Sequence, residues 1–178
     1  MGQDFLPQPG QIFTTVAKAQ RLGGNAVGLA AWEARAITKP DGGALWVTAT
    51  PARHGPAGIE ALSGDVVGFV LSVDEGPTIM SPATRSGSMA SPSWRAASAP
   101  ASCCCSWAPP RSGPFHLTMD VNDAIETAHA FPQAQIVPVH CDPRRILGRR
   151  GTTSRRRSTR LAQRLRLLAP GIPAVIGA

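Results

Sequence analysis

The segment that most constrains the fold is residues 44–56, where an alternating apolar and polar stretch runs into a loop bounded by proline and glycine. Residues 45–50 place apolar side chains at every second position, which is the period of a half-buried β-strand. Pro51 is expected to end this strand. His54 follows on the loop, just past the carboxyl end of the strand, where open α/β folds place their chemistry.

A second apolar run also ends in a histidine. Residues 135–139 read Gln-Ile-Val-Pro-Val, and His140 comes directly after them. Neutral imidazole is the commonest protein ligand for metals, so two histidines at strand ends could converge on one metal ion. The alternative is that each histidine is an ordinary polar residue at the end of a strand. The residue pattern leaves both interpretations open.

These two segments carry a family resemblance. Residues 48–55, Thr-Ala-Thr-Pro-Ala-Arg-His-Gly, and residues 136–140, Ile-Val-Pro-Val-His, resemble the later half of a metallo-β-lactamase-superfamily hydrolase. Within this superfamily, the segments resemble the subgroup that is similar to L-ascorbate-6-phosphate lactonase. The resemblance extends over residues 11–80, 113–142 and 161–176. It implies an α/β (α+β) fold, an αββα sandwich with mixed sheets, one or two metal ions (usually zinc), a small-molecule substrate, and His54 and His140 as metal ligands.

The chain departs from that family at two places. The leading His-x-His-x-Asp-His cluster is absent and would precede Met1, so we expect a chain shortened at its amino end and only a partial sandwich. The acidic turn of Ser-Gly-Asp-Thr type is replaced at residues 81–86 by Ser-Pro-Ala-Thr-Arg-Ser, which has no carboxylate. Zinc sites normally use three or four protein ligands. We therefore expect weak or absent zinc binding and an impaired or inactive hydrolase.

The remaining regular elements follow from periodicity and turn residues. Strands are expected over residues 11–16, 31–38, 65–73 and 78–80, and helices over residues 17–22 and from residue 118 to about residue 131. The strands in the first half lie close together without intervening helices. Antiparallel or mixed pairing is therefore expected there.

Two stretches look irregular: residues 81–112, rich in Ser, Ala and Pro, and residues 143–160, rich in Arg. A shift of reading frame would explain both. If residues 102–108 are encoded by TCG TGC TGC TGC TCC TGG GCG, reading two bases later gives Val-Leu-Leu-Leu-Leu-Gly, a buried strand. The same shift in residues 81–90 yields Ser-Gly-Asp-Thr, and in residues 151–161 it yields an amphipathic helix. We take this as a hypothesis.

The arginine run has a competing interpretation. Eight arginines between Arg144 and Arg160 suit phosphate backbones, and the net charge of the chain is +7, so a basic nucleic-acid-binding protein is an alternative. No aromatic side chain interleaves with the run to stack on bases, and no nucleic-acid motif accompanies it, which argues against that partner. A third hypothesis is a non-catalytic remnant of a hydrolase.

Length and composition favour one incomplete domain over residues 1–178. No basic and apolar leader begins the chain and no apolar run could span a bilayer, so we expect a cytoplasmic protein without a membrane. Four cysteines, three of them adjacent, do not make a disulfide framework. A metal site shared by these three with Cys141 is awkward, because consecutive strand residues point to opposite faces.

Two further histidines lie near the two ends of the second expected helix. His116 precedes the helix cap near the presumed site, and either it contacts substrate or supports a metal ligand, or it is structural. His129 lies near the carboxyl end of the helix, where a cation is favourable, so we interpret it as structural.

Overall fold

The computed structural model describes residues 10–52, 64–82, 100–106, 111–112, 115–116, 121–139, 163–169 and 171–176. Its elements in chain order are β1 (Ile12–Thr14), α1 (Val16–Leu22), β2 (Ala26–Gly28), β3 (Ala34–Thr38), β4 (Ala44–Ala52), β5 (Val66–Val73), β6 (Ile79–Ser81), β7 (Ser102–Ser106), β8 (Arg111–Ser112), β9 (Phe115–His116), α4 (Val121–Ala130) and β10 (Gln135–Val139). None of the helices among these residues is long and apolar enough to cross a membrane.

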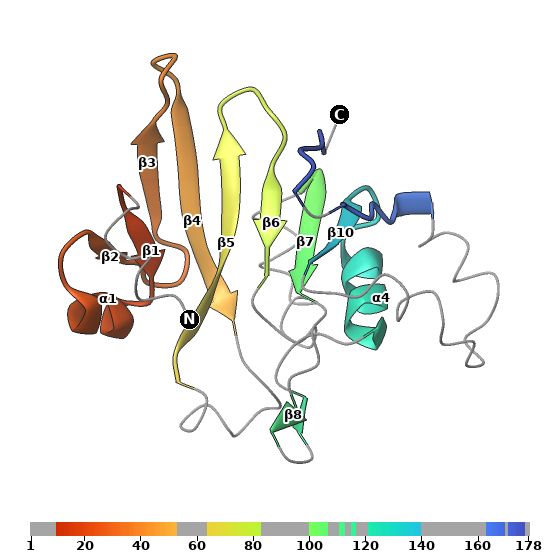
Figure 1. The fold of residues 1–178 in the computed structure, drawn as a ribbon, viewed down its shortest axis with the longest axis horizontal. Helices are drawn as coiled ribbons and strands as arrows, with labels where there is room; N and C mark the ends of the chain where they lie inside the picture. Colours follow the sequence, from red (N-terminus) through yellow and green to blue (C-terminus); the bar gives the residue numbers. More distant parts are fainter. Residues whose placement is uncertain are drawn as a thin grey trace.

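A mixed six-stranded sheet forms the centre of the fold, with strand order β10-β7-β6-β5-β4-β3 (Figure 1). The strands from β3 to β6 pair antiparallel, whereas β6, β7 and β10 pair parallel. This confirms the α+β class and the mixed pairing expected from the sequence. Parallel pairs need a crossover, and α4 supplies the one between β7 and β10.

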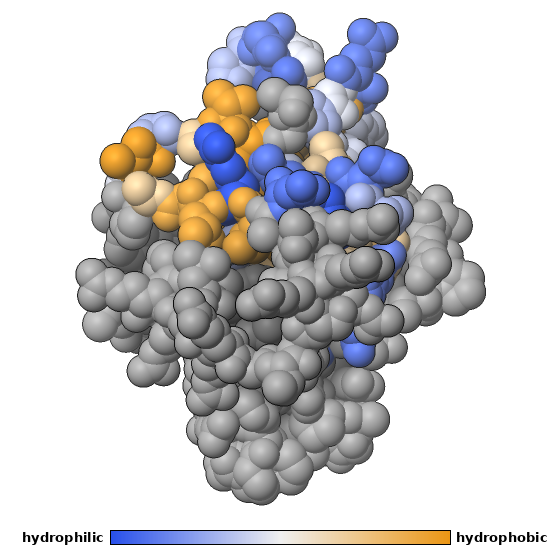
Figure 2. Space-filling model, turned by 90° about the vertical axis from the view of Figure 1, so that its right-hand side faces the viewer, coloured by the Kyte–Doolittle hydropathy of each residue, from blue (hydrophilic) through white to orange (hydrophobic). Residues whose placement is uncertain are grey.

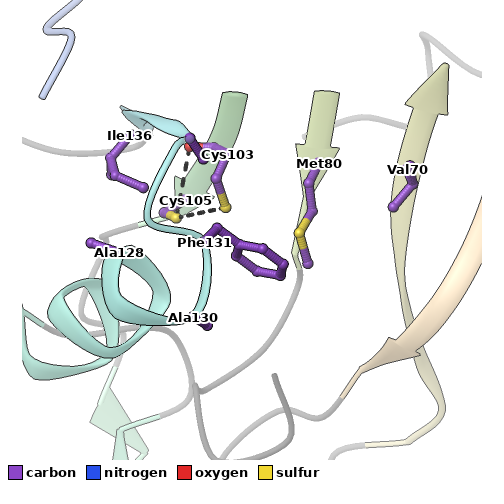
Figure 3. Close-up of a cluster of buried hydrophobic side chains, with 9 residues drawn as sticks. Val70, Met80, Cys103, Cys105, Ala128, Ala130, Phe131 and Ile136 are labelled. Carbon is purple, nitrogen blue, oxygen red and sulfur yellow. Dashed lines mark hydrogen bonds between the residues drawn. The ribbon is translucent and has the colours of Figure 1, made fainter. Parts of the chain in front are cut away.

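The two faces of this sheet carry different layers. Val47 and Ala49 of β4 are buried with Leu29 and the partly buried side chains of the β1–β2 pair, and α1 lies against β1 and β2. The opposite face carries Met80, Cys103 and Ile136, which pack against α4 (Figure 3). Register partners share a face of the sheet, so α4 and the β1–β2 pair lie on opposite sides. The layers are those of a partial αββα sandwich.

The expectation that Pro51 ends the strand over residues 45–50 is wrong. This strand is β4, and it continues through Pro51, which pairs with Val67. Ala49 exchanges hydrogen bonds with residues 32 and 33 on the β3 side of the strand. Backbone groups alternate sides, so residue 51 also faces that side, and β3 pairing has already stopped at Thr48. A backbone N–H at residue 51 would have no strand partner on that side. Proline at this position therefore costs no hydrogen bond between β4 and β5.

The prediction of irregular structure over residues 81–112 is wrong for residues 102–106. These residues form β7, in the middle of the parallel part of the sheet. Cys103 and Cys105 are fully buried on the α4 face, while Cys104 is half-buried on the other face. Small apolar thiols are compatible with a buried strand, and pairing with both β6 and β10 supplies the hydrogen bonds that local propensity does not.

Local signals located both helices correctly. Thr15 caps α1 by accepting the Lys18 N–H at 3.3 Å, and Gly23 ends it with a φ of 66°. In α4, Ala128 and Ala130 are buried and Phe131 follows the last turn into the core. Besides β7, the sequence analysis missed three short strands: β2, which pairs parallel with β1, and β8 and β9, which pair with each other. The strand expected at residues 31–38 starts later, after a turn in which Trp32 has a φ of 69°.

The carboxyl-terminal segment lies at the β10 end of the sheet. Leu165 forms a parallel bridge with Ile136, and the Arg166 N–H donates to the Ile136 carbonyl at 2.8 Å. Figure 2 views this end and shows hydrophobic side chains gathered beside hydrophilic ones. The exposed large apolar residues of the segment are Leu167, Ile172 and Val175.

Candidate metal centre

The candidate centre is defined by the direction of the strands. β5 runs antiparallel to both β4 and β6, so β4 and β6 point the same way, and β7 and β10 run parallel to β6. The carboxyl ends of four strands therefore meet one edge of the sheet. Side chains that follow these strands are the ones that can gather there.

The histidines predicted to bind metal follow two of those strands. His54 comes two residues after β4, and His140 comes directly after β10. Both histidines lie outside the described residues, so their role as ligands stays a prediction. His116 is the last residue of β9, and its backbone pairs with Arg111; its side chain lies outside the described part.

The turn in which the family carries an acidic ligand leaves the same edge. Ser81 ends β6, and Pro82 after it is buried. Residues 83–86 lie outside the described residues. β6 sits between β4 and β10 in the sheet, so all three segments that the resemblance connects with metal start from one edge.

Strand spacing tests the idea that both histidines reach a single ion. Four inter-strand steps separate β4 from β10, which is about 19 Å along the sheet at about 4.8 Å per step. No side chain spans that separation from a strand end. Convergence on one ion therefore requires the loop after β4 to carry His54 across the ends of β5, β6 and β7.

One buried polar group near this edge was not singled out from the sequence. The Thr50 hydroxyl lies two residues before the end of β4, is fully buried and has no hydrogen-bond partner among the described residues. An unpaired buried hydroxyl is costly, so such a group marks a place where a further polar partner would be favourable. Strand alternation had marked Thr50 only as the polar face of β4.

The cysteines of β7 are a separate group. The Sγ atoms of Cys103 and Cys105 lie 3.4 Å apart on the α4 face (Figure 3). The hydrogen bond to Cys105, followed by burial, raises the pKa of Cys103 well above its ordinary value. Metals bind the thiolate, so a raised pKa disfavours coordination.

Within the described residues, no group of three or more His, Cys, Asp or Glu side chains could hold a metal ion. The thiol pair of β7 is thus two ligands short of a tetrahedral site. Cys141, the remaining thiol, falls outside the described part of the chain, as does the arginine run of residues 144–160.

Solved structures resemble the whole arrangement. An isothiocyanate hydrolase from Delia radicum gut bacteria superimposes with a TM-score of 0.63 at 18% identity, covering 96% of this chain and 70% of that one. A possible metal-dependent hydrolase from Veillonella parvula gives 0.69 at 14% identity, covering 92% and 66%. The metallo-β-lactamase fold protein YhfI from Bacillus subtilis gives 0.52 at 11% identity, covering 88% and 60%.

This chain has a partial metallo-β-lactamase fold. It spans 60–70% of the length of these three structures. No family model and no curated protein matches the sequence. At 11–18% identity, the likeness establishes the fold and leaves the chemistry to be argued from the residues.

The metallo-β-lactamase fold accounts for the layers described above. α4, the six-stranded sheet, the β1–β2 pair and α1 follow one another in the order of an αββα sandwich, and the second sheet consists of two short strands among the described residues. The partial sandwich expected from the resemblance is confirmed.

Proposed function

We propose that this chain is a relative of the metal-dependent hydrolases with a metallo-β-lactamase fold, and that His54 and His140 are its metal ligands. The observation that supports the proposal is the common edge at which β4, β6 and β10 end. Three segments distant in sequence start there, and two of them deliver an imidazole within two residues.

Zinc is the metal that we propose for this site. When bound, zinc lowers the pKa of water toward about 7 and polarises the scissile carbonyl or phosphoryl oxygen. Two imidazoles suit zinc but fall short of the three ligands that a catalytic zinc uses, and residues 81–86 contain no carboxylate. We therefore propose that the chain as written binds zinc weakly and hydrolyses little.

The substrate class that we propose is a small-molecule lactone, ester or phosphoester, in keeping with the lactonase-like subgroup that the sequence resembles. His116 is proposed to contact the substrate or to hydrogen-bond a metal ligand. It ends β9, which is paired only with β8 among the described strands, on a connection that leads into α4.

The frame-shift hypothesis gains support from β7. Residues 102, 103 and 105 are fully buried, and the Ser102 hydroxyl has no hydrogen-bond partner among the described residues. The shifted reading places Val at 102 and Leu at 103–105, which would remove the unpaired hydroxyl. Sequencing the coding DNA through codon 161 tests this directly: an unbroken frame that encodes an acidic turn after residue 80 supports the hypothesis, and the printed sequence contradicts it.

Metal content tests the ligand assignment. The purified protein is equilibrated with zinc, dialysed, and measured by inductively coupled plasma mass spectrometry alongside His54→Ala, His140→Ala and His129→Ala. His129 is an exposed histidine near the end of α4 and serves as the matched control. We expect less than one zinc per chain, a further loss in the first two variants, and no loss in the control.

Two outcomes would contradict this proposal in different ways. One zinc ion per chain that remains bound after dialysis would contradict the prediction of weak zinc binding. Equal zinc in all three histidine variants and in the parent would overturn the assignment of His54 and His140.

A further inference from the structure

Among the strands that the structure describes, none pairs with the outer edge of β3. β3 is the last strand of the sheet, and four of its five residues are exposed, with only Ile37 half-buried. At the opposite edge, the carboxyl-terminal segment makes a bridge to Ile136 of β10. Exposed strand edges are templates for pairing with another strand. In the described part of the chain, β3 is thus the edge at which this sheet can be extended.

The register identifies the backbone groups that face outward. Ala49 of β4 directs both its N–H and its C=O toward the β3 side. By alternation Val47 and Leu45 do so too, and their partners Arg35 and Ile37 face β4 in return. The N–H and C=O groups of the other three residues of β3, Ala34, Ala36 and Thr38, therefore point away from the sheet. No described backbone group forms a hydrogen bond with them on that side.

Opposite charges flank β3 at equal distances from Ala36. Glu33 lies three residues before it and Lys39 three residues after it. In an antiparallel pairing of two β3 strands centred on Ala36, Glu33 of each copy lies opposite Lys39 of the other. Opposite charges in directly facing positions stabilise antiparallel pairs. The same pairing places Ala36 against its own counterpart, where two small side chains fit without steric conflict.

Local ion pairs keep the edge close to neutral. Arg35 pairs with Glu33 at 2.9 Å, and Lys39 pairs with Asp41 at 3.0 Å. Lysine and arginine on an edge strand usually discourage pairing. Here each cation has an acidic partner, so the approach of two chains of net charge +7 is not opposed at this edge by unpaired like charges.

We propose that two copies of this chain associate through their β3 strands, joining two six-stranded sheets into one continuous sheet across a two-fold axis centred on Ala36. The contact is isologous, with Ala34 of one copy bonded to Thr38 of the other and the reverse. A pairing of a few residues buries little area, so a weak dimer with a dissociation constant in about the micromolar range is expected.

Sedimentation equilibrium of the full chain between about 1 and 100 μM tests the proposal, because this range brackets the micromolar constant expected for a small interface. The mass should rise with concentration from 18.6 kDa toward twice that value. Ala36→Pro removes one outward N–H and leaves the bonds between β3 and β4 in place, because proline is tolerated where the N–H faces solvent. This variant should stay at the monomer mass with an unchanged far-ultraviolet circular dichroism spectrum.

Lys39→Glu should weaken the dimer about three- to tenfold, because it faces Glu33 of the other copy at two symmetric positions. Lys18→Glu makes the same change of charge on an exposed position of α1 and should leave association unchanged. A mass of 18.6 kDa at every concentration would overturn the proposal. So would a dimer that persists in a folded Ala36→Pro variant, since that result places the interface elsewhere.

Discussion

The guanidinium of Arg164 donates a 2.8 Å hydrogen bond to the main-chain carbonyl of Phe131, just past the last turn of α4. Two more bonds from the same side chain reach the carbonyls of Ala134 and Ala128. The carboxyl end of a helix carries unpaired carbonyls and partial negative charge, which a cation satisfies. Partial burial lowers the pKa of Arg164 from its ordinary value, yet arginine stays charged in proteins.

Arg164→Ala should therefore lower the free energy of unfolding by about 1.5 kcal/mol, because bonds to charged donors are lost while solvent replaces part of them. Arg166→Ala is the matched control, since Arg166 is exposed two residues away, and it should change stability by less than about 0.5 kcal/mol. Urea unfolding followed by circular dichroism measures both. Equal effects in the two variants would show that the helix cap contributes nothing.

Ser102→Ala should raise the free energy of unfolding by about 1 kcal/mol, because the buried hydroxyl of Ser102 has no partner among the described residues. Ser102→Val should raise it at least as much if the site accepts the side chain that the shifted reading frame places there. Urea midpoints measure both. Destabilisation in the alanine variant would reveal a hydrogen bond to that hydroxyl.

Gly28→Ala should destabilise the chain by about 1–3 kcal/mol, the usual range for overpacking. A Cβ at Gly28 would lie 2.7 Å from the Val16 Cα, which is backbone at the start of α1 and cannot move aside cheaply. At Gly10 a Cβ would meet nothing within 4 Å, so Gly10→Ala is the control and should be nearly neutral. Thermal unfolding would contradict the packing argument if both variants melted together.

Stability should fall at alkaline pH. The hydrogen bond to Cys105 and burial raise the pKa of Cys103 above its ordinary value of 9.0, and burial followed by the charge of Cys105 raises that of Cys104. The unfolded chain loses these protons first. The stabilisation is therefore complete below an unfolded pKa near 9 and is lost as pH rises through the folded values, by at most about 1.4 kcal/mol per pH unit for each thiol.

Urea midpoints at pH 7.5 and pH 10 measure this loss. Cys103→Ala should shrink the difference between the two midpoints, although its cavity lowers both. An undiminished difference in that variant would assign the alkaline loss to other groups.

Local patterns determined the helices and the long antiparallel strands. The alternation at residues 45–50, the Thr15 cap and the glycine that ends α1 all act between neighbours in the chain, so they can be recognised in the sequence alone. The histidines after β4 and β10 were likewise marked by their place at strand ends. The last two residues of β4, Pro51 and Ala52, were missed. A proline ends a strand only where the backbone N–H at its position would be needed for pairing.

Tertiary structure decided everything that rests on pairing across distance. β7 is a strand because β6 and β10 pair with it on either side, although its sequence, Ser-Cys-Cys-Cys-Ser, does not predict a strand. The direction of the sheet, which sends three candidate loops to one edge, and the cap of α4 by Arg164 likewise depend on residues brought together only by folding. Such contacts are set by burial and by backbone hydrogen bonds shared between segments, and neither quantity is a property of any one segment.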